Sequence, residues 1–144
     1  MRLLKLLLDH GADPNAAPAW NFGLSALQAA SYVGDVEVAE LLVSRGADID
    51  APPCKYGGGT ALVLATRERD VDMVRFLLRA GAAIPTAGVT SSSFGVSRDY
   101  KERILDLLCI SASELSATYG GNGTPSRDYH EYEAEWAADP SYDA

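Results

Sequence analysis

Three segments of the chain have nearly the same sequence and recur at a single spacing. They are LLLDHGADPNA (residues 6–16), LLVSRGADIDA (residues 41–51) and FLLRAGAAIP (residues 76–85). Gly11, Gly46 and Gly81 are each 35 residues apart, and the intervening stretch GLSALQAASYVGDVEVAE (23–40) returns at that spacing as GGTALVLATRERDVDMVR (58–75). A fixed period of this length indicates a solenoid, in which each small unit buries its apolar face against its neighbours.

Each unit has the pattern of a helix, a turn, a second helix and a glycine stop. Ser25 and Thr60 precede the first helices, where a hydroxyl can accept hydrogen bonds from free backbone N–H groups. Asp35 and Asp70 begin the second helices, where a carboxylate meets the positive end of the helix dipole. The glycine after each second helix suits a left-handed C-cap.

The stretch GLSALQAASYVGDVEVAELLVSRGADID (residues 23–50) resembles an ankyrin repeat. The family pattern G-x-T-P-L-H-x-A-A-x-x-G maps onto Gly23, Ser25, Ala26, Leu27, Gln28, Ala30, Ser31 and Gly34, and less fully onto Gly58, Thr60, Ala61, Leu62, Val63, Ala65 and Thr66. The resemblance covers roughly residues 1–85. It implies a short all-α ankyrin-repeat solenoid with finger loops, made of a half repeat at 1–16 and full units at about 17–51 and 52–85.

The chain departs from the family pattern in two informative ways. The family period is 33 residues, and the two extra residues here fall in the fingers, APAWNFG and PPCKYGG. In this lengthening, and in Ala-Leu-Gln for Pro-Leu-His, the chain resembles ankyrin arrays of filamentous fungi, which are often attached to NACHT-type ATPases. Arg69 stands where the preceding unit has Gly34. Because a left-handed Arg costs about 1 kcal/mol, we expect the last unit to turn differently there.

The part of the chain beyond the repeats divides into three segments. Residues 86–97 have the composition of a loop. A capping helix is expected within 98–116, where Tyr100, Ile104, Leu107 and Leu108 share one face; the alternative is a collapsed fourth repeat. Residues 117–144 hold six acidic residues against one basic residue and no regular period, so we expect a disordered acidic tail. Its five aromatic side chains suggest an alternative, in which the tail docks on a partner or on the array.

The net charge argues against two classes of partner, and the cysteine content indicates a cellular location. The net charge is −8, which argues against nucleic acid and against anionic membrane surfaces as partners. The leucine run at 3–8 is too short to span a bilayer. Cys54 and Cys109 lie far apart and suggest no disulfide framework. An intracellular location, cytoplasmic or nuclear, is therefore expected.

The residues that usually carry catalysis form no recognisable constellation. The two histidines are His10, at the end of a helix, and His130, in the expected tail. Neither cysteine has a histidine partner or metal-ligand spacing visible in the sequence. We therefore expect no enzyme activity, no cofactor and no metal.

A protein-binding surface is the remaining kind of site. In ankyrin arrays, as the resemblance implies, partners bind the finger tips and the exposed side of each first helix. Aromatic residues and Arg are the types that most often anchor such interfaces. The candidate residues are Trp20, Asn21, Phe22, Tyr32, Lys55, Tyr56, Arg67 and Glu68. Trp20 and Phe22 could instead pack under the finger, Tyr32 could pack against the neighbouring unit, and Lys55 could simply be solvated.

These patterns predict a non-catalytic protein–protein interaction module. The alternative is a structural or regulatory terminal piece of a larger ankyrin protein, such as a NACHT-type ATPase, with no binding of its own. The opening leucines bear on this choice, because they have the pattern of a second helix whose first helix is absent. We expect one leucine face to pack on the unit at 23–46 and the other to stay open. Missing upstream sequence is one explanation, and self-association through this face is the other.

Overall fold

The described part of the chain is entirely helical. The computed structural model describes residues 1–17, 23–52, 59–84 and 100–119, and within them it has seven α-helices and no strand. This confirms the expected all-α repeat architecture. The helices are α1 (Arg2–Asp9), α2 (Ala26–Val33), α3 (Val36–Ser44), α4 (Ala61–Arg67), α5 (Val71–Arg79), α6 (Tyr100–Leu108) and α7 (Ala112–Tyr119).

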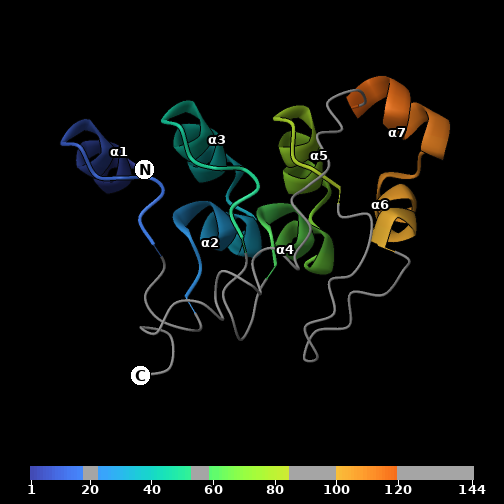
Figure 1. Ribbon diagram of the computed structural model, residues 1–144, viewed down its shortest axis with the longest axis horizontal. Coiled ribbons are helices and arrows are strands. Elements are labelled where there is room, and N and C mark those ends of the chain that lie inside the picture. Colours follow the sequence, from blue (N-terminus) through green and yellow to red (C-terminus); the bar gives the residue numbers. More distant parts are fainter. Residues whose placement is uncertain (18–22, 53–58, 85–99, 120–144) are drawn as a thin grey trace, which may run out of the picture.

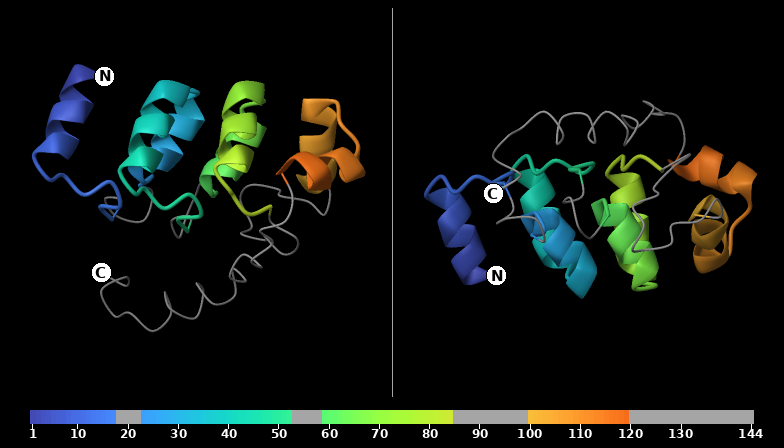
Figure 2. Two further views of the ribbon diagram at one scale, coloured as in Figure 1. Left: turned by 90° about the horizontal axis from the view of Figure 1, so that it is seen from above. Right: turned by 60° about the horizontal axis from the view of Figure 1, so that its bottom comes forward.

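The helices form two rows, one above the other (Figure 1). The first helices α2 and α4 lie in one row with α6, and the second helices α1, α3 and α5 lie in the other row with α7. Within units α2 packs on α3 and α4 packs on α5, while α2 also packs on α4. Figure 2 shows that α1 stands alone at one end of the stack, whereas α6 and α7 lie at the other end.

The helix ends carry the caps that the repeat predicts. The Ser25 hydroxyl accepts the backbone N–H of Gln28 at 3.3 Å, and the Gln28 side chain accepts the N–H of Ser25 at 2.9 Å, which completes a capping box. Asp35 and Asp70 cap α3 and α5 through the N–H groups three residues further on, each at 3.0 Å. The glycine stops at 11, 46 and 81 all have left-handed φ angles, so the local signals and the fold agree.

The core runs along the stack between the two rows. It is formed by the apolar positions that recur with the repeat, and α6 and α7 extend it. The largest fully buried apolar side chains are Leu27, Leu42, Leu62, Leu64, Met73, Val74, Leu77 and Ile104. Small residues such as Ala30, Ala39 and Ala65 let the helices approach closely. Each unit therefore depends on its neighbours to cover its apolar face.

Polar side chains join consecutive units at the ends of the second helices. The Asn15 Oδ1 atom accepts the backbone N–H of Asp48 at 2.7 Å, and its Nδ2 donates to the carbonyl of Gly46 at 2.8 Å. One period later, the Asp50 carboxylate accepts the N–H of Ala83 at 2.9 Å. The period thus appears in the hydrogen bonds between units as well as in the packing.

A second inter-unit link starts from the buried amide of Gln28. Its Nε2 donates to the carbonyls of Ala51 at 3.0 Å and Pro52 at 2.9 Å, while its Oε1 completes the α2 capping box. The Gln28 side chain therefore links the first turn of α2 to the segment that follows the glycine stop at Gly46. Gln28 stands at the position of the family histidine, and the equivalent residue in the next unit is Val63.

The C-terminal segment contains a helix pair where the sequence suggested a single capping helix at 98–116. Ile104 and Leu108 of α6 are buried as predicted, and Leu115 of α7 is buried with them. Cys109 between the helices has a left-handed φ of 53°, and the N–H of Ile110 bonds to the carbonyl of Leu105. The same six-residue closure, from Asp35 N–H to Ala30 carbonyl, ends α2.

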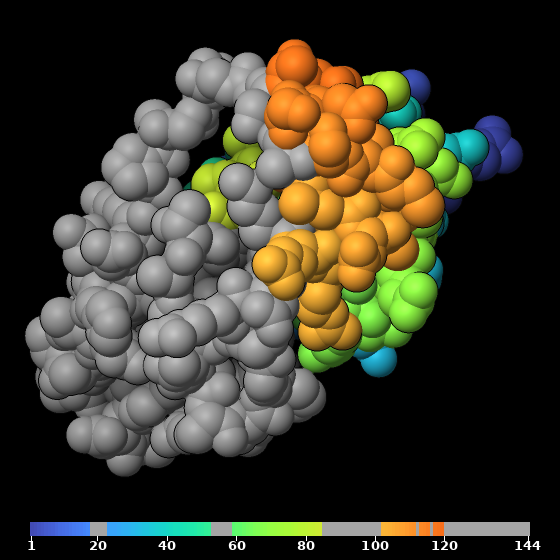
Figure 3. Space-filling model, turned by 90° about the vertical axis from the view of Figure 1, so that its right-hand side faces the viewer, coloured from blue at the N-terminus to red at the C-terminus, as the bar shows by residue number. Residues whose placement is uncertain are grey.

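Helix α6 packs on both α4 and α5, and Figure 3 shows α6 and α7 at this end of the stack. Ser111 and Glu114 form a capping box at its second helix, and the N–H of Ser111 lowers the pKa of the Glu114 carboxyl. Residues 117–119, which the sequence analysis assigned to the acidic tail, are the last turn of α7, because that capping box and the buried Leu115 favour a helix there. The expected loop at 86–97 and the remainder of the tail, 120–144, lie outside the described residues.

The expectation that Arg69 changes the turn is wrong. Arg69 has a φ of 61° and Gly34 has a φ of 82°, so both residues are left-handed. The N–H of Asp70 bonds to the carbonyl of Ala65, as Asp35 does with Ala30. Hydrogen bonds that stabilise the turn offset the steric cost of the Arg side chain.

Candidate functional site

Tyr32 and Arg67 meet on the surface between two consecutive units. They are 35 residues apart and occupy the same position, in the last turn of α2 and of α4. Because the repeat places equivalent positions of α2 and α4 next to each other, the Arg67 guanidinium lies over the Tyr32 ring, 5.5 Å from its centroid. This is the geometry of a cation–π interaction.

Arg67 also forms an ion pair with its neighbour Glu68. The Arg67 Nε atom lies 3.2 Å from Glu68 Oε1, and both side chains are substantially exposed. An exposed pair of this kind contributes little to stability. The Arg67 guanidinium thus contacts both a carboxylate and an aromatic ring.

Val33 extends this surface with an apolar side chain. The exposed fraction is 77% for Val33 and 48% for Tyr32, which makes both unusually open for their size. We call Tyr32, Val33, Arg67 and Glu68 the Tyr32 patch. It combines an aromatic ring, a branched aliphatic side chain and a fixed pair of opposite charges, which is the mixture common at protein interfaces.

The turn chemistry explains why these side chains stand at the surface. Gly34 and Arg69 end the first helices in the left-handed conformation, and the chain then reverses into α3 and α5. In the last turns of these helices Tyr32, Val33 and Arg67 are exposed, whereas Ser31 and Thr66 are buried. The left-handed turns at Gly34 and Arg69 therefore directly follow the residues of the Tyr32 patch.

The structure places three of the eight candidate residues next to one another. Tyr32, Arg67 and Glu68 lie side by side. The finger candidates Trp20, Asn21, Phe22, Lys55 and Tyr56 lie outside the described residues. Val33 was missed, although its equivalent one period later is the charged Glu68, which indicates that this position faces solvent.

The chemistry available in the described residues suits recognition. Within the described ranges, no group of three or more His, Cys, Asp or Glu side chains is placed to hold a metal ion. The carboxyl with a raised pKa, Asp50, lies at the contact between units and not in the Tyr32 patch. Burial is the main cause of this rise, and repulsion from Asp48 adds to it, while the Ala83 N–H bond opposes it.

Comparison with protein families identifies the repeat. The ankyrin repeats family, in a form with three copies, matches residues 1–87, and the chain belongs to this family. No curated protein matches the sequence. Ankyrin repeats are generally protein-interaction modules. None of the described helices is both long enough and apolar enough to cross a bilayer.

Proposed function

We propose that this chain is a non-catalytic protein-recognition module and that the Tyr32 patch is part of its binding surface. The proposal rests on one observation: the Arg67 guanidinium is held over the exposed Tyr32 ring across two units. An ordered and exposed aromatic–arginine pair needs little further ordering when a partner binds, so less conformational entropy is lost.

The partner expected from this chemistry is a protein surface with an apolar side chain beside a carboxylate. The apolar group would cover Tyr32 and Val33, while the carboxylate would accept hydrogen bonds from the Arg67 guanidinium in place of, or together with, Glu68. The finger residues from Trp20 to Phe22, with Lys55 and Tyr56, complete the proposed surface. We place the protein inside the cell, in the cytoplasm or the nucleus, because the chain has few cysteines.

Affinity capture with quantitative mass spectrometry tests the proposal. The full chain, immobilised, should enrich a specific protein, and Tyr32→Ala or Arg67→Ala should reduce that enrichment about tenfold or more. Arg75→Ala is the matched control, because Arg75 is an exposed arginine on α5, in the other row. If the enriched proteins are retained equally by Arg67→Ala and Arg75→Ala, the Tyr32 patch is not the binding surface.

A second candidate function is a structural or regulatory part of a larger ankyrin protein, such as a NACHT-type ATPase. The exposure of three leucines on α1 favours it, because an additional unit would bury them. In that case no partner would be enriched in a manner that depends on the Tyr32 patch.

A further inference from the structure

Arg69 has a backbone conformation that its side chain disfavours. Its φ of 61° is left-handed, and the equivalent residue in the preceding unit is a glycine, Gly34, with a φ of 82°. In any residue with a Cβ atom, this conformation brings Cβ close to the following carbonyl oxygen. The hydrogen bonds that close the turn come from the backbone N–H groups of Arg69 and Asp70 to carbonyls of α4. They need no particular side chain, so glycine would suit the position better than arginine does.

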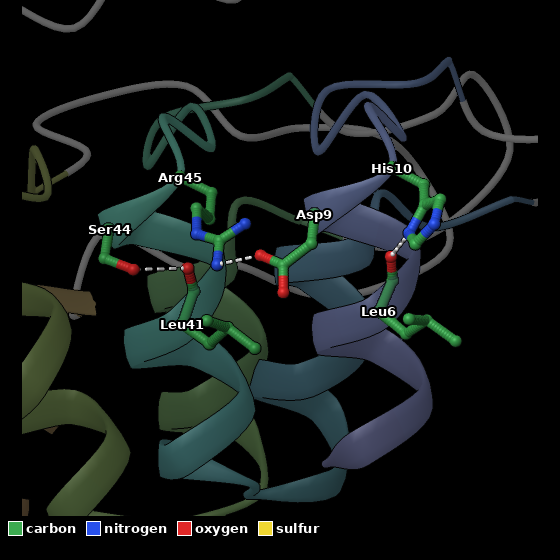
Figure 4. Close-up of polar contacts among 6 residues, drawn as sticks. All are labelled: Leu6, Asp9, His10, Leu41, Ser44 and Arg45. Atoms are coloured by element: carbon green, nitrogen blue, oxygen red, sulfur yellow. Dashed lines mark hydrogen bonds and ion pairs between the residues drawn. The ribbon is translucent and has the colours of Figure 1, made fainter.

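The Arg69 side chain adds no stabilising contact to another described residue. It is exposed, and within the described ranges it makes no ion pair, hydrogen bond or ring contact. Arg45 is the opposite case, because Figure 4 shows the Asp9 carboxylate of α1 turned toward it, with Arg45 Nη2 2.5 Å from Asp9 Oδ1. Strained backbone conformations concentrate at functional sites. A strained residue whose side chain does not support the fold is therefore a candidate for binding.

The turn that contains Arg69 adjoins the Tyr32 patch. Arg69 directly follows the two patch residues that α4 and its C-cap contribute. A Cβ atom at Gly34 would meet the carboxylate of Asp70, so the turn after α4 lies beside the turn after α2. The exposed side chain of Arg69 therefore stands at the edge of the patch that the ends of these two helices form.

The carboxylates nearest to Arg69 in the chain are engaged elsewhere. Asp70 caps α5, because its Oδ1 atom accepts the N–H of Met73 at 3.0 Å, and its Oδ2 atom is the one that faces Gly34. Glu68 pairs with Arg67. Both oxygens of Asp70 thus face the protein, and the charge that Arg69 presents to solvent is positive. Its chemical complement is a carboxylate on a partner.

We propose that Arg69 is a binding residue of the Tyr32 patch and that the partner binds through an acidic segment. One carboxylate of this segment meets Arg67, a second meets Arg69, and an apolar side chain covers Tyr32 and Val33. The inference rests on the proposed function, and it adds a second acidic residue to the partner expected there. A binding residue that costs some stability is a common compromise between function and fold.

Selection from a random peptide library displayed on phage tests the proposal, with the full chain as the immobilised target. We expect the enriched peptides to carry at least two acidic residues near an apolar one. The affinity of an enriched peptide, synthesised and labelled, is then measured by fluorescence anisotropy. It should fall as salt is added, because salt screens the attraction between exposed charges.

Three variants of the full chain separate the charge of Arg69 from its conformation. Arg69→Gly and Arg69→Asn both tolerate the left-handed turn and lack the charge, so each should weaken peptide binding about tenfold or more. Arg75→Ala is the matched control, because it removes an exposed arginine from α5 in the other row and should leave the affinity unchanged. Urea denaturation establishes that each variant is folded, so a weaker affinity reports the lost guanidinium.

The outcomes distinguish this inference from the proposed function. Peptides that need Tyr32 but carry no second acidic residue overturn the role of Arg69 and leave the proposed function standing. The same holds for peptides that bind Arg69→Gly or Arg69→Asn as tightly as the wild type. If no peptide is enriched, or if Tyr32→Ala and Arg67→Ala leave binding unchanged, the Tyr32 patch is not a binding surface and both proposals fail.

Discussion

The carboxylate of Asp50 accepts the backbone N–H of Ala83 at 2.9 Å and so joins two consecutive units. One period earlier, Asn15 makes the equivalent bond to Asp48 and adds a second, from Nδ2 to the Gly46 carbonyl. An ionised carboxylate has no proton with which to make that second bond. Asn15 thus makes two hydrogen bonds to the next unit, whereas the equivalent residue Asp50 makes one.

The first prediction is that Asp50→Asn stabilises the protein. The amide can keep the bond to Ala83 and can donate to the carbonyl of Gly81, the equivalent of Gly46. We expect the free energy of unfolding at pH 7 to rise by about 1 kcal/mol, as measured by urea denaturation. The reciprocal control is Asn15→Asp, which should lower stability by a similar amount. A less stable Asp50→Asn protein would show that the two links are not equivalent.

The second prediction concerns how the stability gained by Asp50→Asn depends on pH. The pKa of Asp50 is raised in the folded protein, so the folded state binds a proton more tightly than the unfolded state. The stabilisation from this proton is complete below the unfolded pKa and is lost as the pH rises through the folded pKa. The advantage of Asp50→Asn should therefore shrink as the pH is lowered from 7 toward about 4, near the ordinary pKa of Asp. An advantage that grows on acidification would mean that the pKa is lowered instead.

The third prediction is that Gln28→Ala destabilises the protein by about 2–3 kcal/mol. The substitution removes the α2 capping box and leaves the carbonyls of Ala51 and Pro52 without their donor. Chemical denaturation measures the loss. Glu40→Ala, at an exposed position on α3, is the control and should change stability by less than about 0.5 kcal/mol. If the two substitutions lower stability by the same amount, Gln28 does not help to join the units.

The fourth prediction separates the two left-handed turns. Arg69→Gly should stabilise the chain by about 1 kcal/mol, because glycine adopts φ of 61° without strain. Gly34→Ala should be destabilising by more than that, because a Cβ there is strained and also meets the carboxylate of Asp70. Thermal denaturation of both variants provides the comparison. Stabilisation by Gly34→Ala would contradict this view of the turn.

The sequence predicts most of the fold because its strongest signals are local. The caps at Ser25, Thr60, Asp35 and Asp70 and the glycine stops depend on neighbouring residues only, and they are confirmed. The 35-residue period repeats these local signals from unit to unit. The turn at Arg69 was predicted incorrectly, because intrinsic conformational cost was weighed without the hydrogen bonds that close the turn.

Contacts between units were harder to predict, since they join residues that are more than 20 positions apart. Gln28 was recognised only as a substitution in the family pattern, although it bonds to two carbonyls of the next finger. The second C-terminal helix had a local signal in Ser111 and Glu114 that the sequence analysis did not use. For the Tyr32 patch, residue type identified Tyr32, Arg67 and Glu68, while Val33 could have been found from its charged equivalent, Glu68.

The central claim is that the Tyr32 patch recognises a protein partner, and hydrogen exchange with mass spectrometry tests it most directly. Exchange of the full chain is compared with and without a captured partner. The account predicts that protection concentrates at the last turns of α2 and α4 and the turns that follow, residues 30–35 and 65–70, and that it is absent when Arg67→Ala is used. Protection confined to the outer helices α3 and α5, with residues 30–35 and 65–70 unchanged, would contradict it.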